Sequence, residues 1–558
     1  MSKTVADTIV DYLVNGGVQR AYGIPGDSID PLVDAIRRNP KLKYIQTRHE
    51  EGAAFAASFD SKFNGMPVAC FGTSGPGSIH LLNGLYDAKM DKASVIAITG
   101  QVERSRLGQD SHQEVNLTKL FDDVSVYNQF ISSSENAPYV ISRAVRDSVR
   151  LKGVSHLNVP FDVFMEKVKD SPSYATKTIT PTYFPDLSEA AAAIDASERP
   201  VLLIGAGALK ESSELADLSY RIGAPIIYAL MGKGIFSDSD KRVLGGLGLL
   251  GTKPSLEAIT KSDLLIEIGS SYPYKQFIPE GIRAIQVDID AGNFSKVFPV
   301  SIPVLSDSHT FIKSILPMVK EKTTKYYEEF VAAGYAWKRE LSDLESKNTG
   351  IVNPALLAHT LSQETKENAI IVTDTGNTTV WIARHYMAKK GQRFLFSGAL
   401  ASMGNSLPGA IGVAMSTDRQ VISAVGDGGF AMTMTELATI RKYNIPVKIL
   451  LFNNSKLGMI KFEQEVEGYP QWGVDLVNPD FSTIASAYGI ESLRISKNSE
   501  IASGVKKMFE SSGPFLLEAI TDPNTRPNPP RITFDQASGY LMASLREKVG
   551  YTPEILSR

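Results

Sequence analysis

Apolar and polar positions along this chain follow the pattern of repeated strand–helix units. Continuous apolar runs lie at residues 68–71, 200–204, 264–269, 369–373, 421–425 and 448–452. Segments with apolar residues at helical spacing lie between such runs, as at 6–14, 31–38 and 430–443. Continuous apolar runs indicate strands buried on both faces, which is typical of parallel sheets covered by helices. The pattern therefore predicts an α/β fold of doubly wound parallel sheets.

Two stretches interrupt this alternation. Residues 169–188 are rich in Ser, Thr, Pro and Lys and predict a linker, and residues 321–352 contain a charged helical segment that we interpret as a solvated connector. A chain of 558 residues is too long for one hydrophobic core. We therefore expect a first domain at 1–168, a central domain at 189–320, a third domain at 353–527 and a mostly helical tail at 528–558. No internal repeat is obvious in the sequence.

Composition and charge narrow the classes of partner. A net charge of −3, with Lys and Arg scattered along the chain, argues against nucleic acid and favours a small molecule. The single cysteine, Cys70, excludes an internal disulfide and a Cys-based metal cluster. The start lacks the pattern of a signal peptide, and no apolar run reaches the roughly 18 residues needed to span a bilayer. We therefore expect a cytoplasmic protein.

The densest candidate chemistry follows the apolar run at 421–425. Gly426-Asp427-Gly428 precedes a helical segment, and Asn453-Asn454 follows the next apolar run after 24 intervening residues, 429–452. Glycines at a strand-to-helix turn let the backbone approach a diphosphate, which the free N–H groups of a helix N-terminus stabilise. Asp427 and Asn454 would meet at one sheet edge, where they could hold a bridging Mg²⁺. Alone, the Gly-Asp-Gly turn would be an ordinary tight turn, and the spaced Asn pair is what favours a cofactor site.

This pair of motifs resembles the signature of thiamine-diphosphate enzymes, and the resemblance covers essentially the whole chain. It implies three doubly wound parallel-sheet domains, in which a pyrimidine-binding fold and a diphosphate-binding fold flank a central Rossmann-like flavin domain. It also implies Mg²⁺ held by Asp427, Asn454 and Lys456. The residues implied for thiamine diphosphate are Glu50, Gly376, Asn377, Ala401, Ser402, Met403, Gly426, Asp427, Gly428, Gly429, Asn454, Leu457, Gly458, Met459 and Ile460.

Glu50 is the catalytic residue that the resemblance implies. Arg48-His49-Glu50 matches the family pattern, in which a carboxyl group kept partly protonated by burial hydrogen-bonds the cofactor's pyrimidine ring. Without the other motifs, Glu50 and Glu51 would be an exposed pair favoured by the helix dipole. Met403 matches the wedge between the two cofactor rings, although such a methionine is ordinarily core filler. Because the two thiamine-binding domains of this family meet across a subunit interface, we expect at least a dimer, and a homotetramer as a dimer of dimers.

Glycine-rich strand ends in the central region suit a nucleotide. Gly205-Ala206-Gly207 lacks the third glycine of the dinucleotide fingerprint, so alone it is weak evidence. Loops at 247–250, 270–274 and 288–293 match the places where pyruvate oxidases, the flavin-containing branch of the family, hold FAD. The residues implied for FAD are Gly205, Ala206, Gly207, Leu247, Gly248, Leu249, Leu250, Ser270, Ser271, Tyr272, Pro273, Tyr274, Asp288, Ile289, Asp290, Asn293 and Asp307.

A few positions separate the oxidase branch from the acetolactate synthases, which are carboligases. Residues 80–87, 374–381 and 535–540 look closest to the quinone-linked pyruvate dehydrogenase type of oxidase. Glu463 stands where carboligases have tryptophan, and Val126 where they typically have lysine. Met459 departs from the phenylalanine of oxidases and matches the carboligase pattern. His112 replaces a phenylalanine common to both branches. A lone histidine is more often structural, but in this pocket it could bind a carboxylate or phosphate.

The resemblance therefore implies oxidative decarboxylation of pyruvate to acetate or acetyl phosphate plus CO₂, with thiamine diphosphate, Mg²⁺ and FAD as cofactors. Electrons would pass from FAD to oxygen or a quinone, and the tail could contact a membrane peripherally. The expected substrate pocket contains His112, Gln113, Ile460 and Glu463. An acetolactate synthase-type carboligase is the alternative, and an inactive structural or regulatory homologue is the second alternative.

Overall fold

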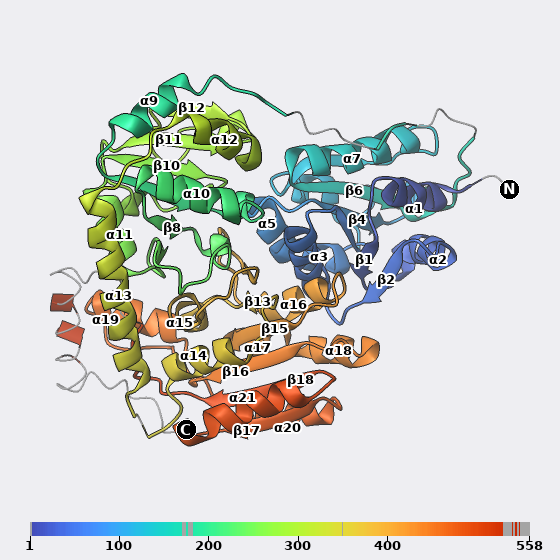
Figure 1. Cartoon of the computed structure of the whole chain (residues 1–558). Helices are drawn as coiled ribbons and strands as arrows, with labels where there is room; N and C mark the ends of the chain where they lie inside the picture. The colour runs from blue at the N-terminus through green and yellow to red at the C-terminus, as the bar shows by residue number, and fades with distance from the viewer. Residues whose placement is uncertain are drawn as a thin grey trace.

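The computed structural model describes residues 3–169, 174–176, 182–348, 350–527, 538–539, 542–543 and 546. It contains three six-stranded sheets, and the strands of each sheet pair in parallel. Helices cover the sheets, and the three domains lie side by side, with the central domain above the third one in Figure 1. The prediction of three doubly wound parallel-sheet domains is confirmed.

The first domain holds a sheet with the strand order β2-β1-β3-β4-β6-β5. Its strands are β1 Arg20–Gly23, β2 Lys43–Gln46, β3 Val68–Gly72, β4 Val95–Gln101, β5 Ser125–Phe130 and β6 Val154–Pro160. Its helices are α1 Val5–Asn15, α2 Asp30–Arg38, α3 Glu50–Asn64, α4 Pro76–His80, α5 Leu82–Met90, α6 Leu117–Leu120, α7 Ala137–Leu151 and α8 Phe161–Met165.

The central domain has the strand order β9-β8-β7-β10-β11-β12, which is the order of dinucleotide-binding sheets. The strands are β7 Pro200–Ile204, β8 Ile226–Tyr228, β9 Val243–Gly246, β10 Leu264–Ile268, β11 Arg283–Asp288 and β12 Ile302–Leu305. The helices are α9 Ser188–Ala196, α10 Ser212–Ile222, α11 Lys253–Lys261 and α12 Ser308–Ile315. The order reverses between β7 and β10, so ligands are expected in the crevice beyond these two strand ends.

The third domain repeats the strand order of the first, as β14-β13-β15-β16-β18-β17. Its strands are β13 Ile370–Thr373, β14 Arg393–Leu395, β15 Val421–Gly426, β16 Lys448–Asn453, β17 Glu491–Ile495 and β18 Phe515–Ile520. Its helices are α14 Pro354–Glu364, α15 Asn377–His385, α16 Ser406–Ala414, α17 Asp427–Thr433, α18 Leu437–Tyr443, α19 Gly458–Val466, α20 Phe481–Ala487 and α21 Ile501–Glu510. The first and third domains are therefore a structural repeat that is not obvious in the sequence.

The segment predicted as one helix over 430–443 is instead two helices, α17 and α18, joined by the 3₁₀ turn Met434–Glu436. The turn directs the Glu436 carboxylate to the start of α3, where it accepts the backbone N–H groups of Arg48 and His49. Glu436 is 1% exposed. The break therefore serves a contact between the first and third domains, which helical periodicity does not reveal.

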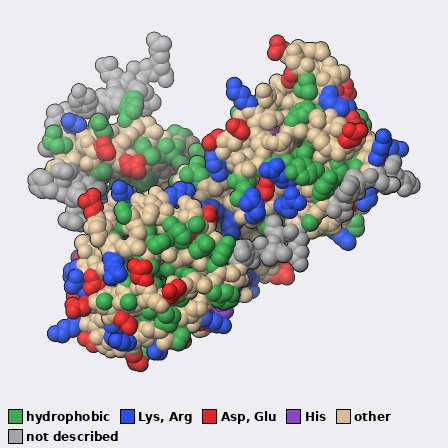
Figure 2. Space-filling view, turned by 90° about the horizontal axis from the view of Figure 1, so that it is seen from above, with side chains coloured by type: hydrophobic (Ala, Val, Ile, Leu, Met, Phe, Trp, Pro, Cys, Tyr) green, Lys and Arg blue, Asp and Glu red, His purple; other side chains and the backbone are tan. Residues whose placement is uncertain are grey.

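Helices α3 and α16 form the main contact between the first and third domains. Gly412 of α16 passes so close to α3 that a Cβ atom there would lie 2.0 Å from the carbonyl oxygen of Ala56. The long helix α13, Lys325–Glu345, runs from the central domain to the third domain (Figure 1). Seen from above in Figure 2, two lobes flank a notch, and basic, acidic and apolar side chains are interspersed on this face.

Two expectations fall partly outside the described residues. Most of the tail, with residues 535–537 and 540, is not described, and neither are residues 170–173 and 177–181 of the expected linker at 169–188. Within the described part of the chain, no helix combines the length and apolar character needed to cross a bilayer.

Candidate active site

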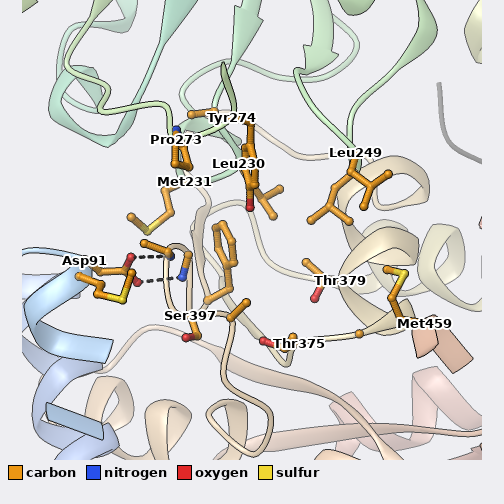
Figure 3. A pocket seen from close by; sticks show the side chains of 18 of the residues that line it. Asp91, Leu230, Met231, Leu249, Pro273, Tyr274, Thr375, Thr379, Ser397 and Met459 are labelled. Carbon is orange, nitrogen blue, oxygen red and sulfur yellow. Dashed lines mark hydrogen bonds between the residues drawn. The ribbon is translucent and has the colours of Figure 1, made fainter. Parts of the chain in front are cut away.

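A cavity of about 940 Å³ lies where the central and third domains face each other (Figure 3). Its walls come from the loops that follow β7 and β10 in the central domain and β13, β15 and β16 in the third domain, with residues 89–92 of the first domain at one side. The loops after β7 and β10, and those after β13 and β15, follow strands between which the strand order reverses. Such switch points are the usual ligand sites of open parallel sheets.

Asp427 begins α17 directly after β15 and is 2% exposed. Burial raises the pKa of its carboxyl group to about 6. The side-chain amide of Asn478 donates hydrogen bonds to Asp427 Oδ2 at 2.6 Å and to Asn453 Oδ1 at 3.0 Å. Asn454 and Lys456 line the same cavity. The Asp427 carboxylate, the Asn454 side-chain amide and the Lys456 backbone carbonyl would offer oxygen ligands of the kind that suits Mg²⁺. The positive charge of the ion would favour the ionised form of the buried Asp427 carboxylate.

Glycines bring the walls of this compartment together. A Cβ atom on Gly428 would lie 3.1 Å from Met403 Cε and 3.2 Å from Leu457 Cδ2, and one on Gly458 would lie 2.3 Å from Asn377 Nδ2. A side chain on Gly458 would collide with Asn377, and one on Gly428 would crowd Met403 and Leu457. The residues expected to hold thiamine diphosphate that line the cavity are Gly376, Asn377, Ala401, Met403, Gly426, Asp427, Gly428, Gly429, Asn454, Leu457, Gly458, Met459 and Ile460.

Asp374 binds the backbone next to the residues expected to hold thiamine diphosphate, although it was not among the expected site residues. The side chain is fully buried at the end of β13 and accepts backbone N–H groups of Thr375 at 2.7 Å, Gly404 at 2.9 Å and Ser406 at 3.3 Å. Burial raises the pKa of its carboxyl group to about 7. Asp374 thus fixes the backbone that follows Met403. Its place directly after a buried strand is the signal that could have revealed it.

The central-domain side of the cavity contains most of the residues expected to hold FAD. Those that line it are Gly205, Ala206, Leu247, Leu249, Leu250, Ser270, Ser271, Tyr272, Pro273, Tyr274 and Asn293. Those that do not line it are Gly207, Gly248, Asp288, Ile289, Asp290 and Asp307. Asp307 caps the N-terminus of α12 by accepting the N–H of Thr310, which gives it a structural role.

Glu267 is a buried carboxyl group at this cavity that the sequence interpretation missed. It lies on β10 beside Leu203 and Gln286 and is 1% exposed. Glu267 Oε1 accepts the N–H of Tyr272 at 3.3 Å, whereas Oε2 and the Tyr272 hydroxyl have no hydrogen-bond partner among the described residues. Burial raises the pKa of the Glu267 carboxyl group to about 7. In the sequence, Glu267 is a single polar residue within an apolar strand, and this pattern does not indicate a ligand site.

Glu50 is the first residue of α3, and its side chain is 10% exposed, so it is not an exposed glutamate. His80 Nδ1 lies 3.1 Å from Glu50 Oε2, and the His80 ring stacks on His49 at 4.4 Å between centroids. The neighbouring Glu51 instead accepts a hydrogen bond from Asn83 at 2.6 Å. The two glutamates therefore have separate partners.

One chain holds two separate groups of the expected residues. Ile460 and Glu463 of α19 line the cavity, but Glu50, His112, Gln113 and Ser402 do not. His112 is exposed, and Gln113 packs against Gly75 at the start of α4, on the side of the first domain that carries Glu50. A cofactor bound in the cavity could meet a Glu50 carboxyl group if a second chain supplied it.

Comparison with known proteins identifies the family. Three models of thiamine pyrophosphate enzymes match the chain: the N-terminal TPP binding domain at residues 3–120, the central domain at 187–315 and the C-terminal TPP binding domain at 374–519. A putative thiamine pyrophosphate-containing protein, YdaP, from Bacillus subtilis is 36% identical over 98% of this chain and 96% of its own length. The chain belongs to the thiamine pyrophosphate enzyme family.

Other thiamine pyrophosphate enzymes represent both branches considered above. A pyruvate oxidase from Lactiplantibacillus plantarum is 31% identical over 92% of this chain and 87% of its own length. The large subunit of acetolactate synthase isozyme 1 from Escherichia coli is 30% identical over 93% of this chain and 94% of its own length. Sequence identity to these relatives therefore does not distinguish oxidation from carboligation, and the distinction depends on residues of the site.

Proposed function

We propose that this thiamine pyrophosphate enzyme oxidatively decarboxylates pyruvate, with FAD as the internal electron acceptor. The observation that carries the proposal is the single cavity that joins the switch point of the central sheet to the Gly426-Asp427-Gly428 turn and Asn454 of the third domain. A carboligation needs no electron acceptor beside the thiamine compartment. A redox reaction does, and a cavity shared by the two domains supports the proposal because it could hold two cofactors next to each other.

The residues of the cavity fit both cofactors. Thiamine diphosphate, when bound, supplies a nucleophilic carbon for decarboxylation of a 2-oxo acid, and FAD accepts two electrons from the product of that step. Asp427, Asn454 and the backbone of Lys456 would hold Mg²⁺ against the diphosphate. Glu50 of a second chain would hold a proton at the pyrimidine ring. With water or phosphate as the final nucleophile, the products are acetate or acetyl phosphate plus CO₂.

Helix α19 supports oxidation over carboligation. Glu463 and Met459 project from α19 to the cavity, and Met459 lies on the same side of it as Leu249 of the central domain (Figure 3). Glu463 stands where carboligases present a tryptophan to the second 2-oxo acid, so this contact for a second substrate molecule is missing. The polarizable side chain of Met459 can contact both cofactors without an aromatic ring.

Acetolactate synthesis is the second candidate, and Leu457-Gly458-Met459 is the observation that favours it, because this triplet resembles the carboligase pattern. The relatives named as acetolactate synthases give it further support. The final electron acceptor in the oxidase proposal is oxygen or a quinone.

Anaerobic mixing with pyruvate tests the proposal. Protein loaded with thiamine diphosphate, Mg²⁺ and FAD should lose its oxidised-flavin absorbance on addition of pyruvate, faster than acetolactate appears. Acetolactate as the main product, with the flavin still oxidised, would instead assign the carboligase function. Glu463→Trp should shift the product ratio toward acetolactate, whereas Glu463→Gln, which keeps a polar side chain of similar size, should shift it less.

A further inference from the structure

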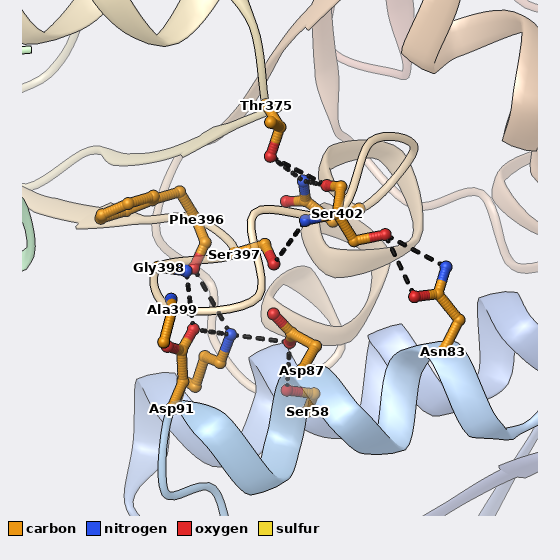
Figure 4. Close-up of polar contacts among 12 residues, drawn as sticks. Ser58, Asn83, Asp87, Asp91, Thr375, Phe396, Ser397, Gly398, Ala399 and Ser402 are labelled. Carbon is orange, nitrogen blue, oxygen red and sulfur yellow. Dashed lines mark hydrogen bonds and ion pairs between the residues drawn. The ribbon is translucent and has the colours of Figure 1, made fainter. Parts of the chain in front are cut away.

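A buried group of charges in the first domain contacts the loop that forms one wall of the cavity (Figure 4). Lys62 of α3 donates to Asp87 at 2.7 Å and to Asp91 at 2.6 Å, and their side chains are 3%, 0% and 5% exposed. Ser58 also donates to Asp87, at 2.6 Å. A cation between two carboxylates in such a buried place has its charge compensated, and both carboxylates are held in one orientation.

Asp91 presents its carboxylate to the third domain. Its Oδ2 accepts the N–H of Gly398 at 2.9 Å, and its Oδ1 accepts the N–H of Ala399 at 3.0 Å. The Lys62 ammonium also reaches the carbonyl oxygen of Phe396 at 3.4 Å. A Cβ atom on Gly398 would lie 3.0 Å from Asp91 Oδ1, so a side chain there would crowd this contact. The charges of the first domain therefore fix three consecutive peptide units of another domain.

The loop at residues 396–403 needs such support. Phe396, Ser397, Gly398, Ala399, Ala401 and Met403 line the cavity. Ala401 has φ of +56°, a left-handed conformation that alanine rarely adopts and that persists only when its surroundings impose it. Near the other end of the loop, Asn83 of the first domain donates to the Ser402 hydroxyl at 3.1 Å. The loop is thus attached at both ends to the first domain of its own chain.

We propose that Asp91, oriented by Lys62, is a positioning residue for the thiamine compartment: it sets the conformation of the 396–403 loop and so the place of Met403. The inference rests on the proposed binding of thiamine diphosphate in the cavity. It gives the first domain a second task, since this domain would support its own chain's cavity while offering Glu50 to a partner chain.

Thiamine diphosphate binding at saturating Mg²⁺ tests the inference in the full-length protein. Asp91→Ala should raise the dissociation constant about tenfold or more, because two charge-assisted hydrogen bonds to the loop are lost. Lys62→Met should raise it too. Gly398→Ala disturbs the same contact from the loop side without removing a buried charge, and we expect a smaller rise in a variant that folds normally.

Arg20→Met is the matched control. Arg20 pairs with Asp60 at 2.9 Å, and Asp60 lies on α3 two residues before Lys62, but the hydrogen bonds of this pair do not involve the 396–403 loop. It should lower the unfolding temperature and leave the dissociation constant within about twofold, which separates positioning from stability. Amide hydrogen exchange without cofactor gives an independent result, because exchange at residues 398–399 should accelerate in Asp91→Ala and not in Arg20→Met.

The outcomes separate the two proposals. Wild-type protein that does not bind thiamine diphosphate would refute the proposed function, while the exchange measurement still decides whether Asp91 holds the loop. Normal cofactor affinity in both Asp91→Ala and Gly398→Ala, or unchanged exchange at residues 398–399, would overturn the positioning role.

Discussion

Asn478 shows how a residue far from the recognised motifs orients a candidate metal ligand. Its amide donates to Asp427 and to Asn453, which joins the two halves of the expected Mg²⁺ site. Losing such a partner typically weakens metal binding by about 10- to 100-fold, so we expect Asn478→Ala to raise the Mg²⁺ concentration needed for thiamine diphosphate binding by that factor. Asp427→Ala should lose Mg²⁺-dependent cofactor binding. Cofactor titrations at several Mg²⁺ concentrations measure both effects, and an unchanged requirement in Asn478→Ala would refute the role.

Glu50 and Glu51 offer a matched pair of substitutions on one helix. Glu50→Gln should keep cofactor binding but lower turnover roughly 100-fold or more, because an amide cannot share a proton with the pyrimidine ring. Glu51→Gln should retain most activity, since Glu51 accepts its hydrogen bond from Asn83, which an amide oxygen also allows. Steady-state kinetics with pyruvate and any suitable electron acceptor measure the difference. Equal losses in the two variants would remove the basis for choosing Glu50.

Glu267 links a buried carboxyl group to the pH dependence of stability. Burial raises its pKa to about 7, above the ordinary 4.5, so the folded protein binds a proton more tightly than the unfolded chain. The contribution of Glu267 to stability is therefore fully present below pH 4.5 and declines as pH rises through 7. Glu267→Leu should remove this decline and make the apoprotein up to roughly 3 kcal/mol more stable than wild type at high pH. Urea unfolding at acidic and mildly alkaline pH tests this, and a pH-independent difference would contradict it.

The same substitution should weaken FAD binding. Glu267 lines the central-domain side of the cavity and has one oxygen without a partner among the described residues, so a ligand donor there would explain why a carboxyl group is buried. FAD titration of Glu267→Leu, with Glu267→Gln as the polar control, measures the effect.

At the scale of elements, strand ends were the most predictable feature. Apolar runs located β7, β15 and β16, and the residues that follow them line the cavity as expected. Periodicity did not predict the break at Met434–Glu436, because the break depends on a contact between Glu436 and the distant start of α3. Asn478 and Glu267 were missed for the same reason: their partners are set by tertiary structure, and neither carries a local signal.

The start of α19 is packed more tightly than its sequence suggests. A Cβ atom on Gly458 would lie 2.3 Å from Asn377 Nδ2 and 2.9 Å from Asn454 Nδ2, so Gly458→Ala must displace two residues of the expected cofactor site. We expect it to weaken thiamine diphosphate binding by about tenfold or more. Gly513→Ala is the control, because nothing lies within 4 Å of the added Cβ there. Calorimetric titration with thiamine diphosphate measures the affinity of both variants. Normal binding by Gly458→Ala would show that the start of α19 can adjust to the added side chain.

At the scale of the whole molecule, the first and third domains have the same strand order, so the order reverses at equivalent places in the two sheets. Different functional residues lie near these two places. The third domain places Asp427 and Asn454 in the cavity, whereas the first domain carries Glu50 outside it. Under the proposed function, Glu50 would have to reach the cavity from a second chain, so a complete site would need a pair of chains. The pair would place the first domain of one chain against the third domain of the other.

Subunit mixing tests this arrangement. Glu50→Gln and Asp427→Ala should each be nearly inactive alone, because every site of either homodimer lacks one essential group. In a mixed dimer, one site combines the intact Glu50 of one chain with the intact Asp427 of the other, and the second site lacks both. Random mixing makes half of the dimers mixed, so co-refolded or co-expressed variants should recover about one quarter of wild-type activity. Differently tagged chains allow the mixed dimer to be purified and assayed. If the purified mixed dimer has no more activity than its parents, Glu50 and Asp427 act within one chain or Glu50 has no part in the reaction, and the two-chain site is wrong.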